Sequence, residues 1–316
     1  MRIAVMGTGG VGGYFGARLA LSGCDVSFIA RGAQLAALRK HGLRVLSAAG
    51  DMHIERVTAT DDPGEVEPVD LVLFGVKLWD TEAAAELLKP MIGSNTAVVS
   101  FQNGVLKDEI LQRVLGERTV MGGVCYIAAT IAEPGVIRHT GAMQRLVFGE
   151  QNGATSERAK AFLAACQKAG INAEISADIR RAIWEKFVFL VGFSGTTSAI
   201  RMPIGAIRSN PRARALLLDA MREVVAVGRA EGVQLAEDFA DNRLAFADTL
   251  PAEMSSSMHN DLERGNRLEV EWLSGDVVRR GIARGILTPV NRVLRDILSM
   301  RAQGPATAAP QPALAR

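Results

Sequence analysis

A glycine-rich segment near the N-terminus limits most strongly what this chain can fold into. Residues 7–12 read GTGGVG, between the apolar run RIAVM and a helical pattern that starts at Val11. In a strand, turn and helix unit of the form G-x-G-x-x-G, the glycines allow the tight turn, the approach of a pyrophosphate and close packing of helix on strand. The alternative is a glycine-rich turn that binds no ligand. The residues of the predicted nucleotide site are Gly7, Thr8, Gly9, Gly10, Val11 and Gly12.

The first part of the chain alternates short β-branched runs with helical patterns. We expect strands at residues 2–7, 25–31, 70–77, 96–104 and 119–129, and two extended runs around a turn in residues 43–60. We expect helices at residues 11–23, 33–42, 80–92 and 107–116. This alternation is typical of a parallel, doubly wound α/β sheet. The sequence therefore predicts an N-terminal Rossmann-type, dinucleotide-binding domain at residues 1–178.

The pattern changes after residue 178, because long helical periodicities replace the strand-like runs. We expect helices over much of residues 181–200, 211–232, 237–250 and 256–285. These predict an all-α C-terminal domain at residues 179–302. Residues 303–316 are rich in alanine and proline and lack a helical face, so we expect them to be disordered.

The composition favours a small-molecule function over binding to nucleic acid or to a membrane. The chain has 36 basic and 34 acidic residues, a net charge of +2, and no apolar run of the length that a bilayer span requires. Its 3 cysteines, widely spaced, are typical of a reduced cytoplasmic protein, and its 4 histidines lack metal-ligand spacing. We expect no metal site. The helical pattern at residues 216–228 could bury a homodimer seam, although the sequence leaves the oligomeric state open.

Three polar residues follow predicted strands at the edge where open α/β sheets bind ligands. Arg31 ends the second strand, where an acidic residue would select NAD, and an arginine can bind a 2′-phosphate, so the sequence favours NADPH. Lys77 could face a phosphate or ribose, and Asn103 could hydrogen-bond to cofactor or substrate. The alternatives are a surface arginine and two residues with structural roles in turns.

Lys186 stands at the head of the nearly unbroken apolar run FVFLVGFSG, where a buried ammonium would be costly. Desolvation lowers the pKa of a lysine toward neutrality, so such a group can protonate a developing alkoxide or attract the carboxylate of an oxo acid. Downstream, the serines before Met258, together with Asn260, could bind a carboxylate, and Glu269 could pair with the lysine. The alternatives are a solvated helix end, a helix cap and a solvated face.

Five segments carry a likeness to a known family, and they are GTGGVGGYFGARLA, VKLWDT, QNG, WEKF and SSMHNDLERGNRLEVEWLSGDVVRRG. In order and spacing they resemble the ketopantoate reductases, which are 2-dehydropantoate 2-reductases that use NADPH. The likeness runs from residue 1 to about residue 300. It implies a Rossmann domain followed by a helical domain, with hydride transfer to the C2 carbonyl of 2-dehydropantoate on the route to pantothenate.

The resemblance also implies roles for single residues. In the first domain, Arg31 and Lys77 correspond to residues that meet the phosphate and ribose region of NADPH, and Asn103 and Ala129 to residues on the nicotinamide side. In the second domain, Lys186 corresponds to the catalytic lysine that protonates the alkoxide. Glu269 corresponds to a glutamate that lies beside the cofactor and pairs with that lysine.

The implied substrate site contains both matches and departures. Ser257 corresponds to the serine that binds the substrate carboxylate, and Asn260 and Ser194 are further candidates for substrate binding. Family members, however, carry asparagines one and two helical turns after the lysine, where this chain has Leu190 and Ser194. A third asparagine is matched by Ile204. Leucine cannot replace the hydrogen bonds of an amide, so the substrate stays open.

Three functions are compatible with these residues. The first is NADPH-dependent reduction of a 2-oxo acid, with 2-dehydropantoate as the leading substrate. The second is reduction of a different, bulkier or more apolar, oxo acid or ketone. The third is a nucleotide-binding protein without turnover, against which the presence of both Lys186 and Glu269 argues.

Overall fold

A computed structural model describes residues 1–304, and the tail expected to be disordered lies outside the described residues from residue 305 onward. The chain divides into two compact units, Met1–Ile183 and a second that begins at Trp184. The division falls within the first turns of helix α6 (Ile179–Ile200), and this helix starts where the sequence predicts the second domain to begin.

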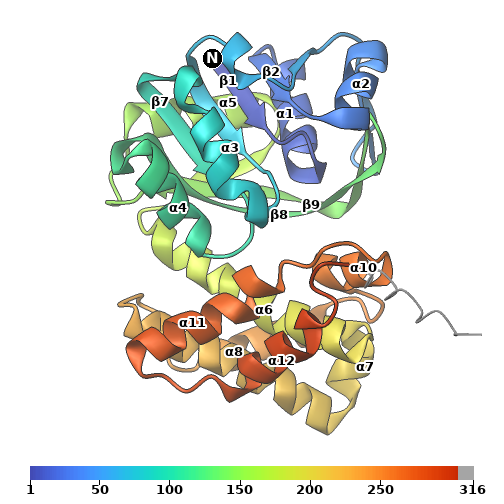
Figure 1. Cartoon of the computed structure of the whole chain (residues 1–316), viewed down its shortest axis with the longest axis vertical. Helices are drawn as coiled ribbons and strands as arrows, with labels where there is room; N and C mark the ends of the chain where they lie inside the picture. Colours follow the sequence, from blue (N-terminus) through green and yellow to red (C-terminus); the bar gives the residue numbers. More distant parts are fainter. Residues whose placement is uncertain (305–316) are drawn as a thin grey trace, which may run out of the picture. The chain divides into compact units, whose positions relative to one another are not determined.

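The first unit is built on a ten-stranded mixed sheet (Figure 1). Its spatial order is β4-β3-β9-β8-β7-β6-β1-β2-β5, with β10 beside β9. The strands are β1 (Arg2–Met6), β2 (Asp25–Ile29), β3 (Leu43–Ser47), β4 (Met52–Ile54), β5 (Thr58–Thr60), β6 (Val69–Phe74), β7 (Ile92–Ser100), β8 (Val120–Glu133), β9 (Val136–Glu150) and β10 (Asn172–Ile175). The six strands from β5 to β8 along this order are all parallel, and β1 lies at its centre. Folds with this strand order bind dinucleotides at the point where the order reverses, beside β1, so the predicted doubly wound fold is confirmed.

Helices cover both faces of this sheet. They are α1 (Gly10–Leu21), α2 (Gly32–His41), α3 (Thr81–Leu87), α4 (Leu106–Leu115) and α5 (Glu157–Lys168), with the 3-10 turns η1 (Pro63–Glu65), η2 (Leu78–Asp80), η3 (Lys89–Met91) and η4 (Glu117–Thr119). Apolar side chains of α1, α2 and α5 share one buried cluster with the strands, and those of α3 and α4 share another. Helix α5 buries one apolar stripe, Ala159, Phe162 and Cys166, whereas α1 buries most of its residues between Gly12 and Leu19.

Part of the sheet was not expected from the sequence. The strand predicted at residues 119–129 continues to Glu133, turns at Gly135 and returns as β9, so that β8 and β9 form a long antiparallel hairpin. Gly135 has a φ of +80°, which glycine adopts without strain. The segment expected to hold two extended runs contains three strands, because β5 pairs with β2 in parallel.

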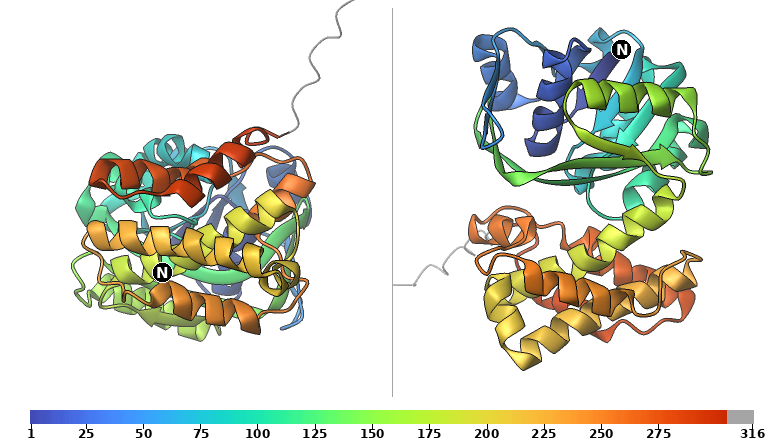
Figure 2. Two further views of the ribbon diagram at one scale, coloured as in Figure 1. Left: turned by 90° about the horizontal axis from the view of Figure 1, so that it is seen from below. Right: turned by 180° about the vertical axis from the view of Figure 1, so that it is seen from behind.

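The described residues of the second unit, 184–304, form helices joined by loops and contain no strand (Figure 2). After α6 come α7 (Ile204–Ser209), α8 (Pro211–Ala230), α9 (Phe239–Thr249), α10 (Ser257–Glu263), η5 (Val270–Trp272), α11 (Ser274–Arg284) and α12 (Pro289–Ser299). Helix α8 packs against α7, α9, α11 and α12. In the part of the chain that the structure describes, no helix has the length and apolar character to cross a bilayer.

Candidate active site

The turn between β1 and α1 has the close backbone packing that its glycines predict. Gly7 has a φ of +96°, and a Cβ placed on it would lie 2.9 Å from the backbone nitrogen of Val76. A Cβ on Gly12 would overlap the carbonyl oxygen of Gly7, and one on Gly10 would overlap that of Ala129. The predicted cofactor residue Ala129 therefore lies directly against the start of α1, and its backbone limits the side chains allowed there.

The N-terminus of α1 fits a pyrophosphate. Gly9 occupies the N-cap position, where no side chain caps the helix, and the first turn contains no acidic residue. A Cβ on Gly9 would meet no atom within 4 Å, so the space in front of this helix end is open. Uncapped N–H groups and the positive end of the helix dipole bind phosphate oxygens.

Thr8, by contrast, has a structural role in the turn. Its side chain is buried, and its Oγ1 donates a hydrogen bond to the carbonyl of Ile29 at 3.1 Å. The carbonyl of Thr8 accepts a hydrogen bond from Nε2 of Gln34 at 3.0 Å. These bonds hold the turn against the end of β2 and the first turns of α2.

Arg31 and Lys77 lie at the carboxyl edge of the parallel sheet. Arg31 is the N-cap residue of α2, and its Nη2 lies 3.6 Å from Oδ2 of Asp80, with side chains 70 % and 42 % exposed. Lys77 precedes η2, and its ammonium lies 5.5 Å from the centre of the Trp79 ring. The structure thus brings the loop after β2 next to the loop after β6, with two cations at the same edge. A guanidinium and an ammonium are the groups that bind anions by charge-assisted hydrogen bonds.

A buried amide joins the loop after β6 to the loop after β7. Nε2 of Gln102 donates to the carbonyl of Val76 at 2.8 Å and to Oγ1 of Thr81 at 2.9 Å. Oε1 of Gln102 accepts from Oγ of Ser100 at 3.0 Å. Since Lys77 follows Val76 and Asn103 follows Gln102, one side chain sets the separation of two predicted cofactor residues.

The sequence does not predict Gln102, Thr81 and Asp80 as site residues. All three lie within two of the segments that resemble the family, QNG and VKLWDT. The available signal was a polar residue directly after a buried strand, where a loop must satisfy its own backbone groups.

Lys186 lies half-buried on α6, on a stripe that continues through Leu190 and Ser194 to Thr197. Residues spaced by three or four positions share one face of a helix. Ser194 is fully buried, and its Oγ has no hydrogen-bond partner among the described residues. Leu190 is half-buried on the same stripe, whereas Ile204 is fully buried at the start of α7. The lysine therefore stands at the end of a stripe that becomes buried along its length.

The serine cluster at the start of α10 separates into a cap and an exposed neighbour. Ser256 is the N-cap residue: its Oγ accepts from the backbone nitrogen of His259 at 3.0 Å and lies 2.9 Å from Oγ1 of Thr197. Ser257 is exposed at the first helical position, and Asn260, also exposed, accepts from Oγ of Ser255 at 3.2 Å. Because Ser256 caps the helix, the hydroxyl of Ser257 is not needed as the cap. The contact between Ser256 and Thr197 places the start of α10 against the stripe of α6 that carries Lys186.

Glu269 is the half-buried N-cap residue of η5. Its carbonyl accepts a hydrogen bond from the backbone nitrogen of Trp272 at 3.0 Å. The pairing of its carboxylate with Lys186, implied by resemblance, stays a prediction.

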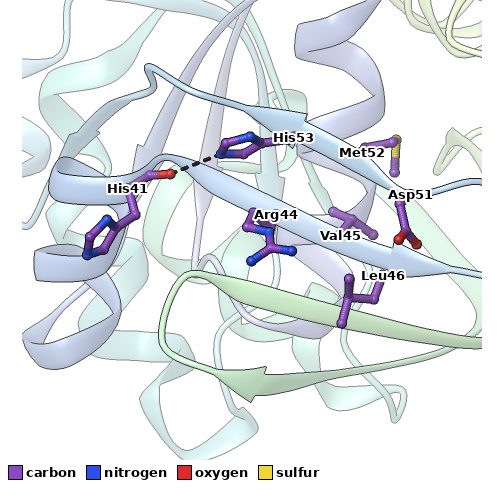
Figure 3. A pocket seen from close by; sticks show the side chains of 7 residues that line it. All are labelled: His41, Arg44, Val45, Leu46, Asp51, Met52 and His53. Atoms are coloured by element: carbon purple, nitrogen blue, oxygen red, sulfur yellow. Dashed lines mark hydrogen bonds between the residues drawn. The ribbon is translucent and has the colours of Figure 1, made fainter.

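A surface hollow of about 510 Å³ lies at the β3–β4 hairpin, and none of these residues lines it (Figure 3). It is lined by His41, Arg44, Val45, Leu46, Asp51, Met52 and His53. Figure 3 shows the His53 ring bonded to the carbonyl of His41, at 3.1 Å. Helix α2 presents its C-terminal end here, which disfavours an anion. We assign this hollow no part in the candidate site. Within residues 1–304, no group of acidic, histidine and cysteine side chains could hold a metal ion.

Comparison with protein families decides which family the two units represent. The family model described as "Ketopantoate reductase PanE/ApbA" matches residues 3–153, and the one described as "Ketopantoate reductase PanE/ApbA C terminal" matches residues 178–302. The chain belongs to the ketopantoate reductase family. Both parts of the predicted resemblance, the nucleotide-binding half and the helical half, are thereby confirmed, and the chain is an oxidoreductase of this family.

Individual ketopantoate reductases are similar over nearly the whole chain. A 2-dehydropantoate 2-reductase of Archaeoglobus fulgidus is 36% identical over 299 residues, which cover 94% of this chain and 96% of that protein. One of Halobacterium salinarum is 33% identical over 301 residues, covering 95% and 98%. The crystal structure of a PanE/ApbA family ketopantoate reductase from Ralstonia eutropha JMP134 has a TM-score of 0.88 at 36% identity, covering 96% of this chain and 98% of that one.

Proposed function

We propose that this ketopantoate reductase catalyses the NADPH-dependent reduction of a 2-oxo acid to a 2-hydroxy acid, with 2-dehydropantoate as its leading substrate and pantoate as the product. This reaction belongs to pantothenate biosynthesis. The observation that carries the proposal is the position of Lys186, a half-buried lysine at the end of a stripe of α6 that becomes buried along its length. Such a group is suited to protonating an alkoxide.

The residues of the first unit would hold the cofactor. The uncapped helix end at Gly9 and Gly10 would bind the pyrophosphate, and Arg31 with Lys77 would bind the 2′-phosphate and ribose. Asn103 and the backbone of Ala129 would lie on the nicotinamide side. Bound NADPH would supply the hydride, and the exposed Arg31 is the feature that favours it over NADH.

The residues of the second unit would handle the substrate. Ser257 and Asn260 would donate hydrogen bonds to the carboxylate, with Ser194 as a further donor. As the C2 carbonyl carbon gains a hydride, its oxygen takes a proton from the ammonium of Lys186, so the C=O double bond becomes a C–O single bond with one new C–H and one new O–H bond. Lys186 is left neutral and regains its proton from water. Glu269 would hold the lysine in place by pairing with it.

A second candidate is reduction of a bulkier or more apolar 2-oxo acid. The observation that favours it is Leu190, one helical turn from Lys186 and half-buried, where a hydrogen-bonding residue would suit the hydroxyl of 2-dehydropantoate. A site without that amide discriminates less strongly in favour of a polar substrate.

The test is NADPH consumption by the purified protein, followed by the absorbance of the reduced cofactor. We expect saturable turnover with 2-dehydropantoate. Its kcat/KM is compared with the values for a panel of other 2-oxo acids. Turnover on another acid alone would move the assignment to the second candidate. Binding of NADPH without turnover on any member of the panel would contradict the reductase proposal.

A further inference from the structure

The face of α6 that carries Lys186 also carries an aromatic pair. Phe189 lies one turn from the lysine and is half-buried, and Phe193 lies one turn further and is 5 % exposed. Their rings stack at 5.2 Å between centres, with planes 15° apart. The stacking fixes the orientation of the outer ring, because the inner ring is held by the core.

Helix α9 extends this pair outward. The ring of Phe246 meets that of Phe189 edge to face at 5.3 Å, with planes 77° apart. Phe246 is 37 % exposed, more than any other phenylalanine, tyrosine or tryptophan of the chain, all of which lie within the described residues. We call Phe189, Phe193 and Phe246 the aromatic platform.

A guanidinium adjoins the platform from the same helix. The Cζ of Arg243 lies 5.5 Å from the ring centre of Phe246 and 5.0 Å from that of Phe239. Its Nε is buried without a hydrogen-bond partner among the described residues. A cation over an aromatic ring holds that ring in place, and its charge attracts anions to the same surface.

These features differ from what a small, hydroxylated acid requires. A preorganised, partly exposed ring beside a guanidinium offers stacking area for a planar group, and the platform includes Phe189, one helical turn from the ammonium that would attract a carboxylate. Leu190 adds apolar surface on the same stripe and no hydrogen bond. An acid that combines a carboxylate with an aromatic side chain uses every one of these groups.

We infer that the aromatic platform is a specificity subsite for the side chain of the substrate, and that this reductase prefers 2-oxo acids with an aromatic or large apolar group at C3. The inference rests on the proposed function, since it assigns the substrate class of that reaction, and it favours the second candidate substrate, a bulkier or more apolar 2-oxo acid, over 2-dehydropantoate. Phe246 is the specificity-determining residue, Phe189 and Phe193 support it, and Arg243 orients it.

The experiment compares phenylpyruvate, 2-oxobutanoate and 2-dehydropantoate as substrates of the whole chain with NADPH. The wild-type protein is expected to show a kcat/KM at least about tenfold higher for phenylpyruvate than for 2-oxobutanoate. Phe246→Ala should lower that ratio about tenfold, chiefly through the KM of phenylpyruvate, because one aromatic contact is lost. Phe246→Leu, which keeps apolar area, should lie between the two.

Phe239→Ala is the matched control, because it truncates a phenylalanine of the same helix that contacts Arg243 and has no ring contact with α6. It should leave the ratio within about twofold. A second readout is calorimetric binding of phenylpyruvate to the protein loaded with NADP⁺, which Phe246→Ala should weaken in parallel. Melting temperatures check that each variant folds.

The outcomes separate the two proposals. Turnover on 2-dehydropantoate or 2-oxobutanoate with no preference for phenylpyruvate, and no change in the ratio on Phe246→Ala, would overturn the aromatic platform alone. A complete lack of turnover on all three acids, despite NADPH binding, would overturn the proposed function and the inference with it. An equal loss in Phe246→Ala and Phe239→Ala would show that the effect is structural and would likewise overturn the assignment of Phe246.

Discussion

The ammonium nitrogen of Lys107 lies 3.0 Å from the carbonyl oxygen of Ser100, the last residue of β7, with 1 % of the lysine side chain exposed. The same ammonium lies 2.7 Å from Oδ1 of Asp108, whose other oxygen accepts from Gln151 at 3.3 Å. A buried ion pair thus holds the start of the loop that carries Gln102 and Asn103, through the hydrogen bond to Ser100. Burying a charge is costly unless it is paired, so we interpret this pair as the anchor of the loop.

Lys107→Met should lower the free energy of unfolding by about 3 kcal/mol, because it leaves the Asp108 carboxylate buried without its cation. Urea unfolding followed by circular dichroism measures this change, and NADPH affinity should fall as the loop loosens. Lys89→Met is the control, since Lys89 is 54 % exposed and its pair with Glu86 contributes little. A loss as small as that of Lys89→Met would contradict the anchoring role. Replacing Asp108 by leucine as well should restore part of the stability.

Much of the first unit could be predicted because its signals are local. The glycines of residues 7–12 need only their own turn, and the strands before Arg31, Lys77 and Asn103 are short apolar runs with a helix after each. Parallel order then follows from the connections, which must cross over the sheet. For the same reason, the sequence alone predicts that these residues lie at one edge of the sheet.

The parts that could not be predicted depend on pairing between distant segments. The apolar pattern of β8 and β9 is compatible with two separate strands as well as with the hairpin that they form. The hydrogen bonds of Gln102 to Val76 and Thr81 join two loops that are distant in the sequence. Periodicity could not tell which of the serines 255–257 caps α10, because each is a good cap by type. Contact with Thr197 selects Ser256.

Lys186→Ala should lower kcat about 10²- to 10⁴-fold, the usual contribution of a general acid. Lys186→Arg should also lose most of the rate, because a guanidinium keeps its charge but holds its proton too tightly to donate it. The dissociation constant for NADPH, measured by fluorescence, should stay within about threefold in both. Lys160→Ala, at a lysine 54 % exposed on α5, serves as the control. A kcat within threefold of the wild type in Lys186→Ala would mean that another group supplies the proton.

Arg31→Ala should raise the dissociation constant for NADPH about tenfold or more and leave that for NADH nearly unchanged, because a charge-assisted hydrogen bond contributes about 1.5–3 kcal/mol. Its pair with Asp80 is exposed, so stability should change by no more than about 0.5 kcal/mol. Arg39→Ala, on the same helix and paired with Asp61 at 3.8 Å, is the matched control. Equal losses for NADPH and NADH would remove Arg31 from the 2′-phosphate site.

Glu150, at the end of β9, accepts two hydrogen bonds of 2.7 Å from Arg158 and one of 2.6 Å from Ser156. Burial acts to raise the pKa of this carboxyl, but the hydrogen bonds and the charge of Arg158 outweigh burial, so its pKa lies below the ordinary value of 4.5. A lowered pKa means that the charged form is favoured in the folded chain. The resulting stabilisation is complete above about pH 4.5 and is lost as the pH falls through the folded-state pKa.

Glu150→Gln should therefore lower the free energy of unfolding at pH 7 by about 1–3 kcal/mol, because a neutral amide makes weaker bonds to the guanidinium. The difference from the wild type should shrink steadily as the pH is lowered below 4.5. Urea unfolding at pH 7 and at a series of acidic pH values measures both quantities. Glu157→Gln is the control, since its carboxylate is 89 % exposed and its pair with Lys160 contributes little at either pH. A Glu150→Gln difference that stays constant across this range would mean that packing, not ionisation, accounts for the stabilisation at this site.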